Sequence, residues 1–315
     1  MDQPARTDPP RQPTVALALG AGGAKGLAHI GAIEEIERRG YRIVAIAGSS
    51  MGALIGGIYA MGKLDVYRDW VSTLAKLDVL RLVDWTFSGG GLIKGEKIIG
   101  TLRELIGDAL IEELPLAYTA VATDIDRGRE VWLARGGLFD AIRASIAIPT
   151  VFRPYTIDGR RLVDGALLNP VPVTPLVREP ADHLIAVSVD GPAEPSTPVE
   201  ETATPPDEHK RRRIAGFIGQ LIPHGEKAAE TRSREPGALD LLAQSMDLMQ
   251  ANLARLRLAA YEPDLLIQLP RNVSAAYEFY RARELIELGR QRTAQALDAW
   301  RAPARAPAVS APPAD

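Results

Sequence analysis

The 315-residue chain contains no cysteine, which excludes disulfide bonds, thiolate metal sites and a cysteine nucleophile. A chain without disulfides suits a reducing compartment. Long hydrophobic runs are also missing, because no stretch reaches the roughly 18 apolar residues that a membrane-spanning helix needs. Residues 1–12 are polar and rich in proline, unlike the apolar centre of a secretory signal peptide. We therefore expect a cytoplasmic protein.

An excess of one charge is lacking as well. The 37 lysine and arginine residues nearly balance the 40 aspartate and glutamate residues, and the formal net charge is −3. This balance offers no overall electrostatic reason to bind nucleic acid, so we expect no nucleic-acid partner. No histidines or carboxylates have the spacing of a metal site, and we expect neither a metal nor a cofactor. The sequence leaves the oligomeric state open.

Patterns typical of strands and helices alternate along the chain, which indicates an α/β fold with a mainly parallel sheet. Short apolar runs predict strands at 15–19, 43–47, 118–122, 130–133, 161–163, 184–189 and 265–269. Apolar residues at helical spacing predict helices at 27–39, 53–61, 66–77, 96–106, 138–146, 237–259 and 275–300. Residues 1–12 and 301–315 are predicted to be disordered tails. The domain is then expected to span residues 13–300, with a flexible insertion at 191–236 that is rich in Pro, Thr and Glu.

The most specific motif is residues 48–52, Gly-Ser-Ser-Met-Gly, which follows a predicted strand and precedes a predicted helix. A Gly-x-Ser-x-Gly sequence at such a turn is typical of a nucleophile elbow. Gly48 and Gly52 would permit the tight turn, because a Cβ at either position would collide with neighbouring backbone. Ser50 is therefore the candidate nucleophile. The ordinary alternative is a glycine-rich helix start that packs closely against the sheet.

A second glycine-rich loop, residues 20–26 with the sequence GAGGAKG, lies between the first predicted strand and the first predicted helix. Successive amides in such a loop can point at one anion, and the following helix adds its positive end. Both loops follow early strands, so they can meet at the carboxyl edge of the sheet. There the backbone N–H groups of the loop would hold the oxyanion formed during attack on a carbonyl. Lys25 would alternatively orient the loop or meet an anionic part of the substrate.

Two nucleotide-binding motifs fit this loop less well. Lys25 stands where the third glycine of a dinucleotide fingerprint belongs, and no acidic residue closes the second strand. A P-loop needs Ser or Thr after its Gly-Lys pair, whereas Gly26 and Leu27 follow Lys25. A tight turn that binds no ligand is the plain alternative.

The general base is not an obvious histidine. A Ser-His-Asp triad needs a histidine on a loop after a late strand. None of the four histidines has this position, since His183 begins a strand, His29 lies one turn into a helix, and His209 and His224 flank the irregular insertion. His29 is expected to be a packed or partly exposed helix residue. A conventional triad is therefore disfavoured.

Asp164 is the better candidate for the base. It ends a short predicted strand and is followed by Gly165-Ala166, which permits a sharp turn. A carboxylate acts as a general base when it reaches the serine and burial raises its proton affinity. An Asp-Gly pair alone is more often a simple turn, and Asp124 and Asp126 are expected to cap turns.

These motifs, in this order, resemble the patatin-like phospholipase family, whose pattern is a glycine-rich loop, Gly-x-Ser-x-Gly and Asp-Gly-Gly or Asp-Gly-Ala. The segments before and after Asp164, residues 144–154 and 169–172, resemble the corresponding family segments. The resemblance covers roughly residues 13–190. Residues 241–292 resemble the bacterial RssA-type branch.

The resemblance implies a three-layer α/β/α sandwich and a Ser50–Asp164 dyad without histidine. It also implies that the backbone at Gly22, Gly23, Ala24 and Lys25 holds the oxyanion. It implies a lipase- or phospholipase-type serine esterase that cleaves a lipid or acyl ester. Asp164 would take the serine proton and later activate a water molecule. Many members carry an arginine at the position of Lys25. The lysine keeps the positive charge but lacks the planar guanidinium group. The alternative from another class is a non-catalytic regulatory or scaffolding protein that retains the fold.

A basic cluster at residues 210–213 precedes an apolar stretch at 214–222. This composition is typical of an interfacial anchor, so residues 210–222 are a candidate for peripheral membrane contact. The alternative is a solvated charge run beside a small packed helix.

Overall fold

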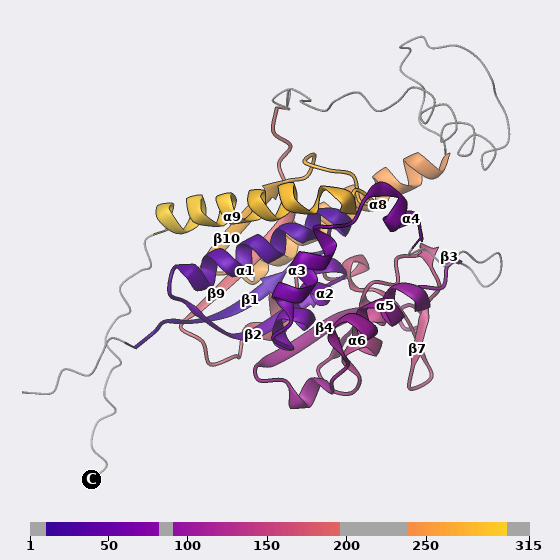
Figure 1. Cartoon of the computed structure of the whole chain (residues 1–315), viewed down its shortest axis with the longest axis horizontal. Coiled ribbons are helices and arrows are strands. Elements are labelled where there is room, and N and C mark those ends of the chain that lie inside the picture. The colour runs from indigo at the N-terminus through magenta and orange to yellow at the C-terminus, as the bar shows by residue number, and fades with distance from the viewer. Residues whose placement is uncertain (1–10, 82–90, 196–237, 301–315) are drawn as a thin grey trace, which may run out of the picture. The chain divides into compact units, whose positions relative to one another are not determined.

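A computed structural model describes residues 11–81, 91–195 and 238–300 of the chain (Figure 1). The chain divides into two units, residues 1–193 with 246–315 and residues 194–245, and each is described by itself. In the second unit the described residues are 194–195 and 238–245, the latter being the start of helix α8 (Ala238–Ala260). The first unit contains all the other elements described below.

A sheet of eight strands forms the centre of the first unit. Its order is β10-β9-β1-β2-β4-β8-β7, and β5 pairs with β4. The strands are β1 (Thr14–Leu19), β2 (Arg42–Ser49), β4 (Ala117–Asp124), β5 (Arg129–Leu133), β7 (Tyr155–Ile157), β8 (Arg160–Asp164), β9 (His183–Gly191) and β10 (Leu265–Pro270). The strands from β10 to β4 are parallel, whereas β5, β7 and β8 pair with antiparallel neighbours. Two short strands, β3 (Gly91–Ile93) and β6 (Thr150–Phe152), form a separate parallel pair.

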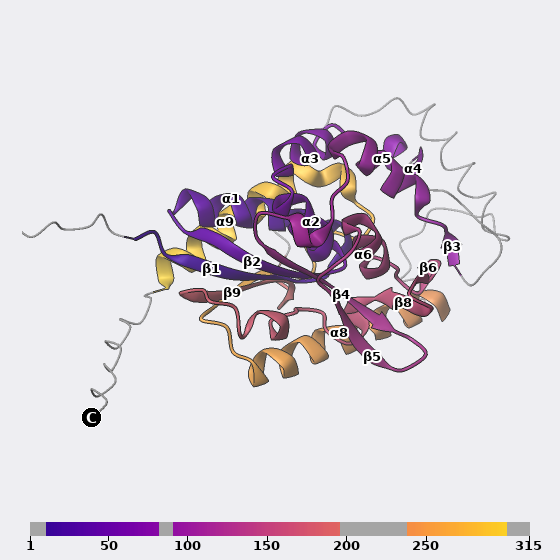
Figure 2. The ribbon, with the colours of Figure 1, turned by 90° about the horizontal axis from the view of Figure 1, so that it is seen from below.

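Helices cover both faces of this sheet. The α-helices besides α8 are α1 (Ala28–Arg38), α2 (Met51–Ala60), α3 (Leu64–Val71), α4 (Lys76–Arg81), α5 (Glu96–Ile106), α6 (Leu138–Ser145) and α9 (Ala282–Ala299). Short 3-10 turns are η1 (Gly23–Leu27), η2 (Ile111–Glu113), η3 (Gly165–Leu167), η4 (Thr174–Leu176) and η5 (Phe279–Arg281). Figure 2 shows α1, α2, α6 and α9 on one face of the sheet and the part of α8 from Met246 onward on the other. The predicted α/β architecture with a mostly parallel sheet between helical layers is therefore confirmed.

The alternation of side chains along β1 explains the two layers. Leu17 and Leu19 belong to the large core shared with α1, α2 and α9, and both are fully buried. Ala16 and Ala18, on the opposite face, belong to a smaller core that includes Ala254 of α8. Since successive strand residues point to opposite faces, the large side chains fill one interface and the alanines the other.

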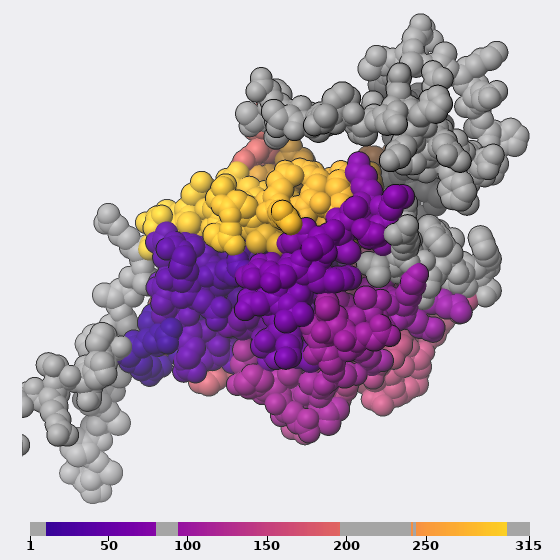
Figure 3. Space-filling view, in the orientation of Figure 1, coloured from indigo at the N-terminus to yellow at the C-terminus, as the bar shows by residue number. Residues whose placement is uncertain are grey.

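Helices α1 and α9 pack closely on the larger core, and Figure 3 shows α9 (yellow) lying along the N-terminal part of the chain (indigo). A Cβ added at Gly31 of α1 would lie 1.9 Å from the carbonyl oxygen of Ile286. A Cβ at Gly289 of α9 would lie 2.0 Å from that of Ala28. A glycine on each helix thus allows the two backbones to approach, which fixes α1 behind the loop that precedes it.

The β7–β8 hairpin has a two-residue turn at Asp158 and Gly159. Asp158 and Gly159 have φ angles of 50° and 71°, and Ile157 pairs with Arg160. Two successive residues with positive φ are typical of a tight two-residue hairpin turn. This hairpin positions β8, which ends at Asp164.

Two helix predictions were wrong. The segment 66–77 forms parts of two helices, α3 and α4, instead of one. The final helix begins at Ala282 and not at residue 275. The carboxylate of Glu278 accepts a 3.0 Å hydrogen bond from the amide of Ala275, which stabilises a turn in place of the expected first helical turns.

The predicted tails 1–12 and 301–315 and the insertion 191–236 fall almost wholly outside the described residues, as does the candidate membrane segment 210–222. They stay predictions. None of the helices in the described segments combines the length and the apolarity needed to cross a membrane.

Candidate active site

Ser50 lies at the sharp turn between β2 and α2, directly before the first residue of the helix. Its backbone has φ 54° and ψ −121°, a conformation that non-glycine residues rarely adopt. A Cβ at Gly48 would lie 2.3 Å from the carbonyl oxygen of Gly52, and a Cβ at Gly52 would lie 2.0 Å from that of Leu19. Both glycines of the motif are therefore required by the close approach of backbone to backbone.

Two buried hydroxyl groups hold this turn in place. The amide of Ser50 donates a 3.0 Å hydrogen bond to Oγ of Ser145, whose hydroxyl donates in turn to the carbonyl oxygen of Val121 at 2.6 Å. The hydroxyl of Ser49 donates to the carbonyl oxygen of Asn169 at 2.6 Å. The sequence indicated Ser145 only as part of the family-like segment 144–154, because its partner is 95 residues away.

Strand β4 brings the serine and the aspartate together. Over residues 120–124, one edge of β4 is occupied by β5, so β2 and β8 share the other edge. Ser49, the last residue of β2, pairs with Val121, and Asp164, the last residue of β8, pairs with Ala122. Since β2 runs parallel and β8 antiparallel to β4, their carboxyl ends meet on consecutive residues of the same strand.

The side chains of Ser50 and Asp164 are in direct contact. The Ser50 Oγ donates a 2.6 Å hydrogen bond to Oδ2 of Asp164, and the amide of Ala166 donates to Oδ1 at 2.8 Å. Only 5% of Ser50 and 3% of Asp164 is exposed to solvent. Burial raises the pKa of Asp164 to about 6, although the hydrogen bonds from Ser50 and Ala166 oppose this shift. The carboxylate is thus a base of useful strength near neutral pH.

The other two acidic loop residues do not reach the serine. The carboxylate of Asp124 accepts a 3.1 Å hydrogen bond from the amide of Arg127, which is the predicted turn cap. Asp126 instead forms an ion pair with Arg161 of β8. Both residues therefore stabilise the β4–β5 turn region and leave Asp164 as the carboxylate at the serine.

The glycine-rich loop touches the elbow. A Cβ at Gly26 would lie 2.5 Å from Cγ of Met51, and a Cβ at Gly52 would lie 2.8 Å from the carbonyl oxygen of Gly20. The two loops after β1 and β2 are therefore in van der Waals contact at the carboxyl edge of the sheet. Met51 opens α2, and the first amides of a helix have no acceptor within the helix.

The four predicted oxyanion residues differ in what their polar groups contact. The amide of Ala24 donates a 2.9 Å hydrogen bond to the carbonyl oxygen of Ala276, so it is engaged within the protein. Gly22 directly precedes η1 and Gly23 is its first residue, so the amides of both lack an acceptor within the helix. Neither of these two amides has a hydrogen-bond acceptor among the residues that the structure describes.

Lys25 anchors the loop from its far end. Its Nζ lies 2.5 Å from Oδ1 of Asp190, near the carboxyl end of β9. Burial raises the pKa of Asp247 of α8, and the positive charge of Lys25 opposes this shift. This pairing favours the interpretation in which Lys25 orients the loop.

The described histidines are not hydrogen-bonded to the dyad. His29 is completely buried in α1, and its Nε2 lies 2.7 Å from the carbonyl oxygen of Gly20. Burial lowers its pKa to about 4, although the hydrogen bond to Gly20 and the charge of Asp190 oppose this shift. His183 begins β9 and packs its ring against Trp300. His209 and His224 lie outside the described residues.

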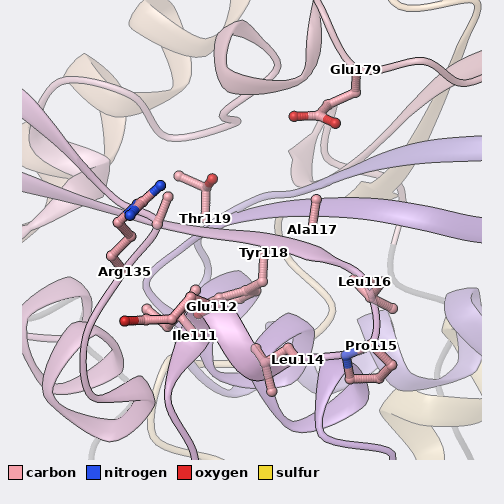
Figure 4. A pocket seen from close by; sticks show the side chains of 11 residues that line it. Ile111, Glu112, Leu114, Pro115, Leu116, Ala117, Tyr118, Thr119, Arg135 and Glu179 are labelled. Atoms are coloured by element: carbon pink, nitrogen blue, oxygen red, sulfur yellow. The ribbon is translucent and has the colours of Figure 1, made fainter.

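A pocket of about 420 Å³ lies elsewhere, at the amino end of β4 (Figure 4). Ala117, Tyr118 and Thr119 of β4 line it, with Arg135 and Glu179 at its sides. The amino end of β4 lies opposite the edge at which Ser50 and Asp164 meet, so this pocket is separate from the dyad. Within residues 11–81, 91–195 and 238–300, no group of three or more His, Asp or Glu side chains is arranged to bind a metal ion.

Comparisons with known proteins identify the family to which the chain belongs. The model of the patatin-like phospholipase family matches residues 17–177. An uncharacterised NTE family protein of Mycobacterium tuberculosis is 41% identical in an alignment 333 positions long, which covers 91% of this chain and 92% of that protein. The neuropathy target esterase sws of Drosophila melanogaster is 30% identical over 183 residues, 56% of this chain and 13% of that protein.

Among solved structures, VipD from Legionella pneumophila matches 92% of this chain and 67% of its own chain, with a TM-score of 0.44 and 14% identity. The family model covers more than half of the chain, and the mycobacterial relative aligns with nearly all of it. The chain therefore belongs to the patatin-like phospholipase family.

Proposed function

We propose that this chain is a serine acyl hydrolase that cleaves the ester bonds of lipids, with Ser50 as nucleophile and Asp164 as general base. The observation that carries the proposal is the 2.6 Å hydrogen bond from Ser50 Oγ to Oδ2 of the buried Asp164. A serine hydroxyl is a weak nucleophile unless a base removes its proton, and this carboxylate is in position to do so. Membership of the patatin-like phospholipase family supports a lipid ester as the substrate.

In the first half-reaction, Ser50 Oγ attacks the ester carbonyl carbon while its proton passes to Oδ2 of Asp164. The carbonyl oxygen becomes an oxyanion, and the C–O bond to the alcohol then breaks. The departing alkoxide takes the proton from Asp164 and leaves as the alcohol. The product on the enzyme is an acyl ester of Ser50.

The amides of Gly22 and Gly23 are the proposed donors to this oxyanion, and Met51 at the start of α2 supplies a third amide in the same region. Such donors act best in a site that excludes water, as the buried dyad does. Losing one donor typically costs about 3 kcal/mol of transition-state stabilisation. Ala24 and Lys25 contribute by holding the loop, through Ala276 and Asp190.

In the second half-reaction, a water molecule replaces the alcohol. Asp164 takes a proton from the water as its oxygen attacks the acyl carbon, and the resulting oxyanion occupies the same amides. The bond between the acyl group and Ser50 breaks, and the serine oxygen recovers its proton from Asp164. A fatty acid leaves, and the dyad returns to its starting state.

Labelling with a fluorophosphonate probe and hydrolysis of a chromogenic short-chain ester test the proposal. We expect the wild-type protein to be labelled at Ser50 and to hydrolyse the ester. Ser50→Ala should lose both properties, and Asp164→Asn should lose turnover with the fold retained. Ser245→Ala, which changes an exposed serine of α8, is the matched control and should behave as wild type.

Full activity of Ser50→Ala would refute the dyad. A well-folded wild-type protein that neither reacts with the probe nor hydrolyses any ester in a lipid extract would favour the non-catalytic alternative. Released fatty acids, detected by mass spectrometry, would also identify the acyl chain and head group.

We also propose that residues 210–222 contact a membrane surface. Membership of the RssA-type branch is a separate part of the proposal. A variant that lacks residues 207–225 should bind liposomes less strongly than the full chain. Unchanged binding would remove the membrane segment from the proposal and leave the dyad unaffected.

A further inference from the structure

His29 is a buried polar residue that the proposed chemistry does not use. No part of its side chain is exposed, and its Nε2 lies 2.7 Å from the carbonyl oxygen of Gly20. Because a carbonyl oxygen only accepts hydrogen bonds, Nε2 must carry the hydrogen. The other ring nitrogen, Nδ1, is buried and has no hydrogen-bond partner among the described residues. His29 is therefore a neutral imidazole with a single donated hydrogen bond.

This hydrogen bond acts on a peptide group that is fixed from both sides. The carbonyl of the Gly20–Ala21 peptide accepts from His29, and its amide, on Ala21, donates to the carbonyl oxygen of Pro170 at 2.9 Å. The amide of Gly20 donates to the carbonyl oxygen of Val187, also at 2.9 Å. The next two peptide groups along the chain supply the amides of Gly22 and Gly23. Their direction depends on the orientation of the peptide that precedes them.

The carbonyl of Gly20 also borders the elbow, because a Cβ at Gly52 would lie 2.8 Å from its oxygen. Rotation of the Gly20–Ala21 peptide would therefore disturb both the glycine-rich loop and the turn that carries Ser50. The hydrogen bond from His29 prevents this rotation from the side of α1. Helix α1 is itself held by the close packing of Gly31 against α9.

A role in packing alone does not account for this residue. A buried polar atom without a partner destabilises the fold, and Nδ1 is such an atom among the described residues. An aliphatic side chain would fill the space without that cost. The proton transfers of the dyad are complete without a histidine, and Nε2 is already engaged with Gly20. The remaining role for the His29 side chain is to orient the glycine-rich loop.

We propose that His29 is a positioning residue of the oxyanion loop, and that its hydrogen bond to Gly20 directs the amides of Gly22 and Gly23. The proposal rests on the proposed hydrolase function, since it assigns those amides to the oxyanion. Donors must lie about 2.7–3.1 Å from the oxyanion, so a small rotation of the loop weakens them. His29 does not touch the substrate or the dyad.

Two variants of similar size separate the hydrogen bond from packing. His29→Gln keeps an N–H donor at about the place of Nε2, whereas His29→Met has the same length and no donor. We expect His29→Met to lower kcat for a chromogenic ester about tenfold or more with little change in KM. It should also weaken the binding of a trifluoromethyl ketone inhibitor by a similar factor, because such a ketone forms an oxyanion when Ser50 adds to it. His29→Gln should recover most of both losses.

Equal kcat in the wild-type and His29→Met proteins would overturn the proposal. The proposal would also be overturned if both variants lost kcat and inhibitor affinity equally, in proportion to their fall in melting temperature. That pattern would indicate a role in packing. The ketone provides the sharper comparison, since its affinity depends on oxyanion stabilisation and not on release of product.

Hydrogen exchange at the backbone amides tests the loop without any activity. We expect exchange in residues 20–27 to be faster in His29→Met than in wild type and to return towards wild type in His29→Gln. If the wild-type protein hydrolyses no ester, the proposed function fails while the exchange experiment still decides whether His29 holds the loop. Unchanged exchange in a fully active protein would instead remove His29 alone.

The wild-type protein provides a measurement that does not depend on a variant folding. Nitrogen NMR of protein labelled in its histidines should show one ring with hydrogen on Nε2 and not on Nδ1 at pH 7. Asp190, which is paired with Lys25, is the charged group that acts on His29. Hydrogen on Nδ1 alone would contradict the proposed hydrogen bond to Gly20.

Discussion

The Oγ of Ser50 lies 2.6 Å from Oδ2 of Asp164, although the two residues are 114 positions apart in the sequence. Both side chains are buried, and the hydrogen bond joins the ends of two strands that pair with β4 on consecutive residues. A base in this position controls the nucleophile through its own protonation state. The pKa of Asp164 therefore sets the conditions under which the proposed chemistry proceeds.

We expect the rate of ester hydrolysis to rise with pH up to a midpoint near 6 and then to level off. Asp164 must be ionised to accept the serine proton, and burial raises its pKa to about 6. The measurement is kcat/KM for an uncharged ester between pH 4.5 and 8.5, which reports the free enzyme. A profile with no ionisation below pH 7 would contradict Asp164 as the base.

Replacement of the aspartate should stabilise the protein at neutral pH while it abolishes turnover. The folded-state pKa of Asp164 is raised, so the folded protein holds this proton more tightly than the unfolded chain. The corresponding stability is fully present below about pH 4 and is lost as pH rises through about 6. At pH 7 the loss is about 3 kcal/mol, from roughly two pKa units at about 1.4 kcal/mol each.

The asparagine side chain of Asp164→Asn cannot ionise, so this variant avoids the loss of stability at neutral pH. We expect its free energy of unfolding to exceed that of wild type by about 1–3 kcal/mol at pH 7 and to approach it near pH 4. Chemical denaturation at both pH values measures the difference. Asp69→Asn, an exposed change on α3, is the control and should shift both values little. A variant less stable than wild type at pH 7 and at pH 4 alike would contradict the burial argument.

The sequence predicted the sheet, the elbow and the candidate residues from local patterns. Alternating large and small residues in β1, and the contact of Gly48 with Gly52 in the elbow, have their structural reason within a few positions. The meeting of Ser50 with Asp164 came from the family resemblance. It depends on the register of β2 and β8 along one edge of β4, and no local pattern encodes such a register.

The same limit explains what sequence reasoning missed. Ser145 and His29 act on Ser50 and Gly20 through single hydrogen bonds, and neither residue type marks such a role in a sequence. Residues 275–281 have a helical pattern, yet Glu278 caps a turn there. That turn places Ala276 against the amide of Ala24, which removed one of the four expected oxyanion donors.

Loss of the Ser145 hydroxyl should weaken both the fold and the proposed catalysis. Ser145→Ala leaves the amide of Ser50 and the carbonyl of Val121 without their buried partner. We expect the free energy of unfolding to fall by about 1–3 kcal/mol, with a lower kcat because the strained turn at Ser50 relaxes. Ser245→Ala, an exposed change, should leave both values close to wild type. An unchanged kcat in Ser145→Ala would show that the turn holds without this hydrogen bond.

A glycine comparison separates backbone strain from damage to the oxyanion loop. Gly23 and Gly40 have φ angles of 54° and 85°, so an alanine at either position costs about 1–2 kcal/mol of stability. A Cβ at Gly23 would lie 2.7 Å from the carbonyl oxygen of Ala276, whereas a Cβ at Gly40 meets nothing within 4 Å. The added methyl at Gly23 must therefore displace the loop from Ala276, and with it the amides of Gly22 and Gly23.

We expect Gly23→Ala to lower kcat at least about tenfold, because misdirected donors lose part of the roughly 3 kcal/mol that each supplies to the transition state. Gly40→Ala should keep the wild-type kcat although it carries the same kind of backbone strain, since Gly40 lies at the end of α1, away from the glycine-rich loop. Ester hydrolysis and chemical denaturation of the two variants, measured side by side, provide the comparison. If Gly23→Ala retains the activity of Gly40→Ala, the amides of Gly22 and Gly23 do not hold the oxyanion, and other donors such as Met51 must be sought at the start of α2.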